Sequence, residues 1–179
     1  TERELMRRSS QINDIVMERA SAWIREGMTE REIADYIVSQ YAAEGCDAMA
    51  FQPIVSFGPH AADPHHEADQ TRLKAGDCIV IDMGCRKDRY CSDMTRTFFC
   101  GTPDPKYAAI HDLVREANEL AESMIRPGVK LCDLDKAAHE WMKENFDALG
   151  AALFAVEQLV SLTADTLQML PVVQTKEEN

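Results

Sequence analysis

Two aspartates, Asp82 and Asp93, each lie in a largely apolar arm of one segment, residues 76–99, which reads GDCIVIDMGCRKDRYCSDMTRTFF. The first arm is β-branched and the second alternates as a half-buried strand does, so we expect a β-hairpin. If Lys87 and Asp88 form a two-residue turn, Asp82 lies directly opposite Asp93 on one face. A longer loop or a bulge shifts this register by a residue.

Two carboxylates in such a pair lie roughly 5 Å apart between Cβ atoms and repel each other. A cation or a shared proton must compensate this repulsion, and a divalent metal ion is the simplest compensation. The alternative is that one aspartate caps a turn or pairs with Arg86, Arg89 or Arg96. Carboxylates alone favour Mg, Ca or Mn, whereas added imidazoles favour Zn, Co or Mn, so the residues leave the metal open.

Three motifs occur in order around these aspartates: SFGPHAADPHH, GDCIVIDMG and YCSDMTRTF. Together they resemble the creatinase/aminopeptidase P family of pita-bread metalloenzymes. The resemblance covers about residues 1–147 and is densest over 53–101. It implies an α/β (α+β) fold, a curved and mainly antiparallel sheet covered by helices, of which this chain carries the first part.

The resemblance also implies functional roles. Asp82 would bind one metal ion and Asp93 would bridge two, with Mn, Co or Zn as the ions. His65 matches the histidine beside the substrate that stabilises the tetrahedral intermediate, and His66 is a weaker candidate. The implied reaction is hydrolysis of a short peptide by a metal-activated water, as in Xaa-Pro aminopeptidases and dipeptidases. Creatinase-type amidinohydrolysis and a non-catalytic binding module are the alternatives.

The family's three further ligands, one histidine and two glutamates, have no matching motif here. An internal repeat suggests a reason, because residues 24–28 (IREGM) reappear as 125–129 (IRPGV), at an offset of 101. At this offset, a second hairpin would fall beyond residue 179. One hypothesis is therefore a homodimer in which two half-barrels face each other and share a metal cluster.

Composition narrows the class of protein. The net charge of −12 and pI near 4.8 argue against nucleic acid or an anionic membrane surface as partners. We find no signal peptide and no apolar stretch long enough to span a bilayer. The six cysteines have no CxxC spacing and are interpreted as reduced packing residues, which favours a cytoplasmic location.

Local signals predict the elements that position these residues. Thr29 and Glu32 form a capping box, and Asp104 followed by Pro105 is typical of a helix start. The expected elements are helices over 2–26, 29–45, 105–127 and 133–147, a strand over 51–57, and a loop through Pro64 that presents His65. We assign residues 1–149 to the pita-bread region. Residues 150–179 form a divergent tail, whose apolar spacing over 150–170 predicts a helix packed on its own core or on a partner.

Overall fold

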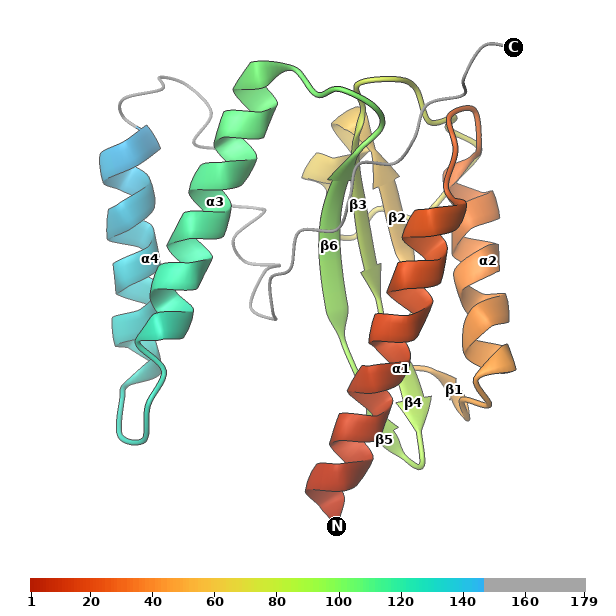
Figure 1. Cartoon of the computed structure of the whole chain (residues 1–179), viewed down its shortest axis with the longest axis horizontal. Coiled ribbons are helices and arrows are strands. Elements are labelled where there is room, and N and C mark those ends of the chain that lie inside the picture. The colour runs from red at the N-terminus through yellow and green to blue at the C-terminus, as the bar shows by residue number, and fades with distance from the viewer. Residues whose placement is uncertain (147–179) are drawn as a thin grey trace. The chain divides into compact units, whose positions relative to one another are not determined.

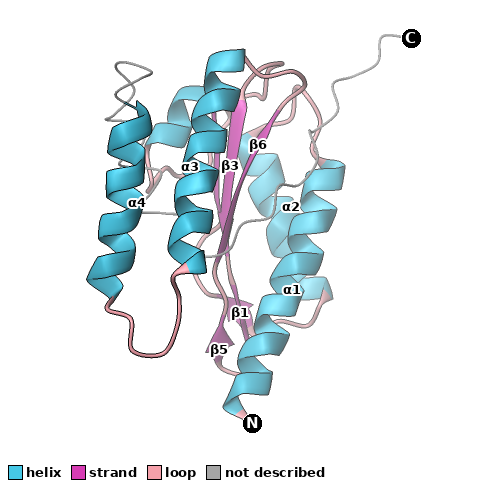
Figure 2. Cartoon of the chain, turned by 60° about the vertical axis from the view of Figure 1, so that its left-hand side comes forward, coloured by secondary structure: helices cyan, strands magenta, loops and turns pink. Residues whose placement is uncertain are grey.

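The computed structural model describes residues 1–146, which fall into two compact units, 1–103 and 104–146 (Figure 1). The first unit contains two helices and two small antiparallel sheets, and the second contains a helix pair (Figure 2). The elements of the first unit are α1 (Glu2–Trp23), α2 (Glu30–Ala43), β1 (Ala48–Met49), β2 (Ile54–Phe57), the 3₁₀ segment η1 (Gly58–Ala62), β3 (Cys78–Met83), β4 (Cys85–Lys87), β5 (Tyr90–Cys91) and β6 (Met94–Phe99). This mixed α/β architecture with antiparallel sheets confirms the expected fold class.

The two N-terminal helices begin where the sequence predicts. The hydroxyl of Thr29 accepts a hydrogen bond from the backbone N–H of Glu32 at 3.1 Å, and the Glu32 carboxylate accepts from the Thr29 backbone N–H at 2.7 Å. This reciprocal pair satisfies two N–H groups that a helix start otherwise leaves without partners. Gly27, with φ of +87°, provides the left-handed residue at which the chain turns between α1 and α2.

The larger sheet has the order β2-β3-β6, and β3 pairs antiparallel with both neighbours. Side chains of β3 alternate, so that Ile79, Ile81 and Met83 lie in the hydrophobic core with residues of α1 and α2. Asp82 lies between Ile81 and Met83 in the strand and therefore faces the opposite side of the sheet. Both helices cover the core side of this sheet (Figure 2).

The predicted hairpin register is wrong by two residues. The turn residues are Asp88 and Arg89, both with positive φ (50° and 71°), and Asp82 pairs with Thr95 instead of Asp93. A two-residue turn of type I′ requires left-handed backbone at both positions. The carboxylate of Asp47 stabilises this turn by accepting a hydrogen bond from the Arg89 backbone N–H at 3.1 Å. Asp47 lies 42 residues before Arg89 in the sequence. A shift of two residues keeps every side chain on its face.

The second unit repeats the helix pair of the first. Its helices are α3 (Pro105–Ser123) and α4 (Leu131–Phe146). As predicted, Asp104 caps α3 by accepting from the backbone N–H of Lys106 at 2.8 Å, and Pro105 is the first helical residue.

The offset of 101 residues appears in the backbone as well as in the sequence. Helix α4 starts at residue 131 and α2 at residue 30. The connecting turns match, since Gly27 and Gly128 have φ of 87° and 89°. The N–H of the following residue donates to the carbonyl two positions before each glycine, at 3.2 and 3.1 Å. The internal repeat is therefore a repeat of local structure.

Two predictions concern residues that the structure does not describe. The helix expected over 150–170 lies outside the described residues, and so does the domain boundary at residue 149. Among residues 1–146, no helix combines the length and apolar character needed to cross a membrane.

Replacing Gly84, which joins β3 to β4, tests how closely the backbone approaches Ser92, between β5 and β6. A Cβ at this position would lie 2.1 Å from the carbonyl oxygen of Ser92, so backbone must move. We expect Gly84→Ala to lower the free energy of unfolding in urea by about 3 kcal/mol. Gly27→Ala is the control, because it meets open space and costs about 1 kcal/mol through its positive φ alone. Equal losses for the two variants would contradict this account.

Candidate metal centre

Asp82 and Asp93 come together on the sheet face opposite the α1–α2 core. Asp82 is the fifth residue of β3, and Asp93 lies directly before β6. Since Asp82 pairs with Thr95, Asp93 is its diagonal neighbour on the same face. The Asp93 charge is close enough to raise the pKa of Asp82, and Thr95 acts on the same carboxyl in the opposite direction. The two aspartates therefore share one face, as expected, but as diagonal neighbours and not as the directly opposed pair that the sequence predicted.

A buried polar network fixes the backbone next to Asp93. The side-chain oxygen of Asn13, on α1, accepts hydrogen bonds from the hydroxyls of Tyr41 at 2.7 Å and Ser92 at 2.9 Å. The Ser92 N–H donates to the Cys85 carbonyl at 2.9 Å. Because Ser92 directly precedes Asp93, this network holds Asp93 in position from the core side of the sheet.

Burial and repulsion act together on Asp82. Its side chain is 9% exposed, and loss of water raises its pKa to about 6, with the Asp93 charge as the second cause. Thr95 opposes this shift by donating to the carboxylate. Two facing carboxylates in this setting are stabilised either by a shared proton or by a cation.

The donor set fits a divalent ion. The Oδ1 atom of Asp82 is buried and has no hydrogen-bond partner. Buried polar atoms are nearly always satisfied, so an orphaned carboxylate oxygen beside a second carboxylate requires an explanation. A metal ion coordinated by both carboxylates would satisfy it.

The structure gives the two neighbouring histidines, His65 and His66, different environments. His65 is exposed, and its backbone N–H donates to the Asp63 carboxylate at 2.9 Å. The His66 side chain is 13% exposed and its Nε2 lies 2.6 Å from Oε2 of Glu30. Both residues lie in the β2–β3 loop, as expected for His65.

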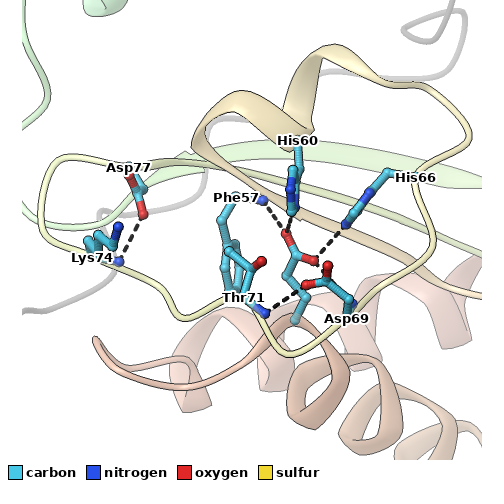
Figure 3. Close-up of polar contacts among 8 residues, drawn as sticks. Phe57, His60, His66, Asp69, Thr71, Lys74 and Asp77 are labelled. Carbon is cyan, nitrogen blue, oxygen red and sulfur yellow. Dashed lines mark hydrogen bonds and ion pairs between the residues drawn. The ribbon is translucent and has the colours of Figure 1, made fainter.

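A second group of metal-ligating side chains surrounds Glu30, the first residue of α2. One ligand atom each from Glu30, His60, His66 and Asp69 lies within 4.8 Å of the others. The rings of His60 and His66 point in the same direction, with centroids 4.1 Å apart (Figure 3). We name these four residues the Glu30 cluster.

Sequence reasoning missed Glu30, His60 and Asp69. Glu30 is 30 residues from His60 and 36 from His66, so no local pattern joins them. The available signal was His60, His66 and Asp69 in one short loop. The motif match drew attention to His65, which lies outside the cluster.

Comparison with known proteins decides the family. The model of metallopeptidase family M24 matches residues 4–161. The chain belongs to metallopeptidase family M24. An uncharacterized peptidase of Staphylococcus saprophyticus is 36% identical to this M24 chain over 144 residues, which are 80% of the chain and 41% of the relative.

Solved structures give the same result. An X-Pro aminopeptidase from Thermotoga maritima is 34% identical, with a TM-score of 0.76, over 79% of this M24 chain and 40% of its own length. The prolidase from Pyrococcus furiosus has a TM-score of 0.77 at 34% identity, over 79% of this chain and 42% of its own. The fold is therefore a partial pita-bread fold, as expected, and the chain spans about 40% of the length of these relatives.

The raised pKa of Asp82 predicts how the stability of this M24 chain depends on pH. Between pH 4 and 6 the folded metal-free protein holds a proton that the unfolded chain releases, so stability falls as pH rises through this window. We expect Asp82→Asn to abolish this fall and to gain up to about 3 kcal/mol at pH 7 over the wild type.

Urea unfolding at a series of pH values, with a chelator present, measures this difference. Asp35→Asn, an exposed change on α2, is the matched control and should leave the curve unchanged. A wild-type stability that rises between pH 4 and 6 relative to Asp82→Asn would refute the assignment.

Proposed function

We propose that this chain carries the first metal-ligand pair of an Xaa-Pro peptidase, with Asp82 and Asp93 as the ligands. The observation that carries the proposal is the pair of facing carboxylates, one with a buried oxygen that lacks a hydrogen bond. Membership of family M24 supports it, and so does the similarity to an X-Pro aminopeptidase and a prolidase.

The two carboxylates would bind the metal ions in different ways. Asp82 is buried in the sheet and would bind one ion, whereas Asp93 is exposed beside it and would bridge two. When bound, divalent ions supply Lewis-acid chemistry that polarises a scissile carbonyl and makes water a stronger nucleophile. Manganese, cobalt and zinc are the candidate ions, since two carboxylates with added imidazole suit each of them.

His65 is the proposed contact to the reacting peptide bond. Its side chain is exposed on the β2–β3 loop, so it is accessible to a ligand. A positioned imidazole N–H can donate to an oxyanion that develops on the scissile carbonyl. The hydrogen bond between its own N–H and Asp63 holds the backbone of this residue in place.

The remaining elements of the proposal concern the whole protein. The substrate is a short peptide cleaved before proline, and the reaction takes place in the cytoplasm. The family's further ligands must come from elements beyond the described residues or from a second copy in a homodimer. The general base belongs to that same missing set.

Calorimetric titration of the metal-free chain with Mn²⁺ tests the ligand assignment. We expect binding at micromolar concentration or tighter, and at least tenfold weaker binding for the Asp82→Asn, Asp93→Asn double variant. Asp77→Asn, at the start of the same hairpin, is the control and should bind as the wild type does. Unchanged Mn²⁺ binding in the double variant would refute the assignment.

Peptide assays with the metal-loaded chain test the activity separately. Hydrolysis of Xaa-Pro dipeptides and longer Xaa-Pro peptides, but not of creatine, is the expected outcome. Turnover of creatine alone would favour the amidinohydrolase. Metal binding without turnover of either substrate would indicate a binding module.

A further inference from the structure

The Glu30 carboxylate is fully buried and accepts four hydrogen bonds. Its Oε1 accepts from the backbone N–H of Phe57 at 2.9 Å and lies 3.0 Å from His60 Nδ1. Its Oε2 lies 2.6 Å from His66 Nε2 and accepts from the backbone N–H of Asp69 at 3.2 Å. In Figure 3 the dashed lines from His60 and His66 end on one unlabelled carboxylate, which is that of Glu30. Two imidazoles and two backbone amides thus converge on a group with no solvent contact.

The negative charge of the buried Glu30 carboxylate must be balanced. A buried carboxylate is costly unless it is paired. Within residues 1–146, no lysine or arginine forms an ion pair with Glu30, whose recorded ion-pair partners are His60 and His66. Asp69 adds a second carboxylate to the group. Protonating both rings, whose centroids lie 4.1 Å apart, would place two like charges next to each other.

We infer that Glu30, His60, His66 and Asp69 form a second divalent transition-metal site, distinct from the Asp82–Asp93 pair. Two neutral imidazoles, two carboxylates and one divalent ion sum to zero charge. Two histidine nitrogens with carboxylate oxygens are a set that zinc prefers and that calcium and magnesium do not. The inference goes beyond the proposed peptidase function.

The ligand atoms lie within 4.8 Å of one another and would have to rearrange around an ion. Ligand atoms around a tetrahedral ion at about 2.0 Å lie roughly 3.3 Å apart. The His60 contact, at 3.0 Å, is close to that spacing, and the His66 contact must open from 2.6 Å. Asp69 is exposed, so the cluster contacts solvent at this residue.

The two sites occupy different ends of one strand. Glu30 binds the N–H of Phe57, the last residue of β2, whereas Asp82 pairs with Ile54, the first. Three residues along a strand span roughly 10 Å, too far for the ligand sets to share an ion. An ion at Glu30 would join α2, η1 and the β2–β3 loop, and so fix the backbone beside His65.

Zinc binding to the full chain in the Asp82→Asn, Asp93→Asn background tests the site. We expect calorimetry to give one Zn²⁺ bound per chain, and Co²⁺ in its place to give the visible absorption of a tetrahedral site. Adding His60→Gln and His66→Gln should weaken Zn²⁺ binding at least tenfold. Adding His65→Gln instead should leave it unchanged, because His65 lies outside the cluster.

A direct measurement keeps the test valid if the glutamine variants unfold. The measurement is a nitrogen-15 NMR spectrum of the aspartate double variant, in which all histidines are retained. Adding Zn²⁺ should shift the resonances of Nδ1 of His60 and Nε2 of His66. No Zn²⁺ binding in the aspartate double variant would overturn the inference. Zinc that shifts only His65, His111 or His139 would overturn it too.

Discussion

The antiparallel pairing of β3 with β2 on one side and β6 on the other is the constraint on which the first unit depends. It places alternate β3 residues in the core beneath α1 and α2, and so leaves Asp82 on the other face. The alternation along β3 holds the strand in its register, because a slip by one residue would turn the Asp82 carboxylate into the apolar core and move its apolar neighbours to the other face. The same pairing that stabilises the sheet therefore brings two repelling carboxylates together.

Elements determined by neighbouring residues could be predicted from the sequence. The capping box of Thr29 and the Asp104–Pro105 start depend on contacts within three residues, and both were correct. The hairpin was predicted for the same reason. Its register was wrong because the turn uses Asp88 and Arg89 in left-handed backbone, stabilised by Asp47 from outside the hairpin. Asp82 and Asp93 still lie on one face of the sheet because the register differs from the predicted one by an even number of residues.

Long-range contacts could not be predicted in this way. Nothing near Glu30 in the sequence marks it as the centre of a histidine cluster, and its partners are brought to it by the docking of the β2–β3 loop on α2. The motif match directed attention to His65 and Asp82 and away from Glu30. The arrangement around Glu30 depends on the tertiary structure, which joins residues far apart in the sequence.

The docking of the β2–β3 loop has a consequence for its conformational entropy. Residues 58–77 would form a long, costly connection if they were free. Backbone hydrogen bonds join Asp69, Thr71 and Leu73 to the residues around the start of α2, and the Glu30 carboxylate also contacts His60, His66 and the backbone N–H of Asp69. The loop is thereby divided into short closed segments. His65 lies in the segment between His60 and His66, so its side chain can adjust to a ligand while the rest of the loop loses almost no further freedom.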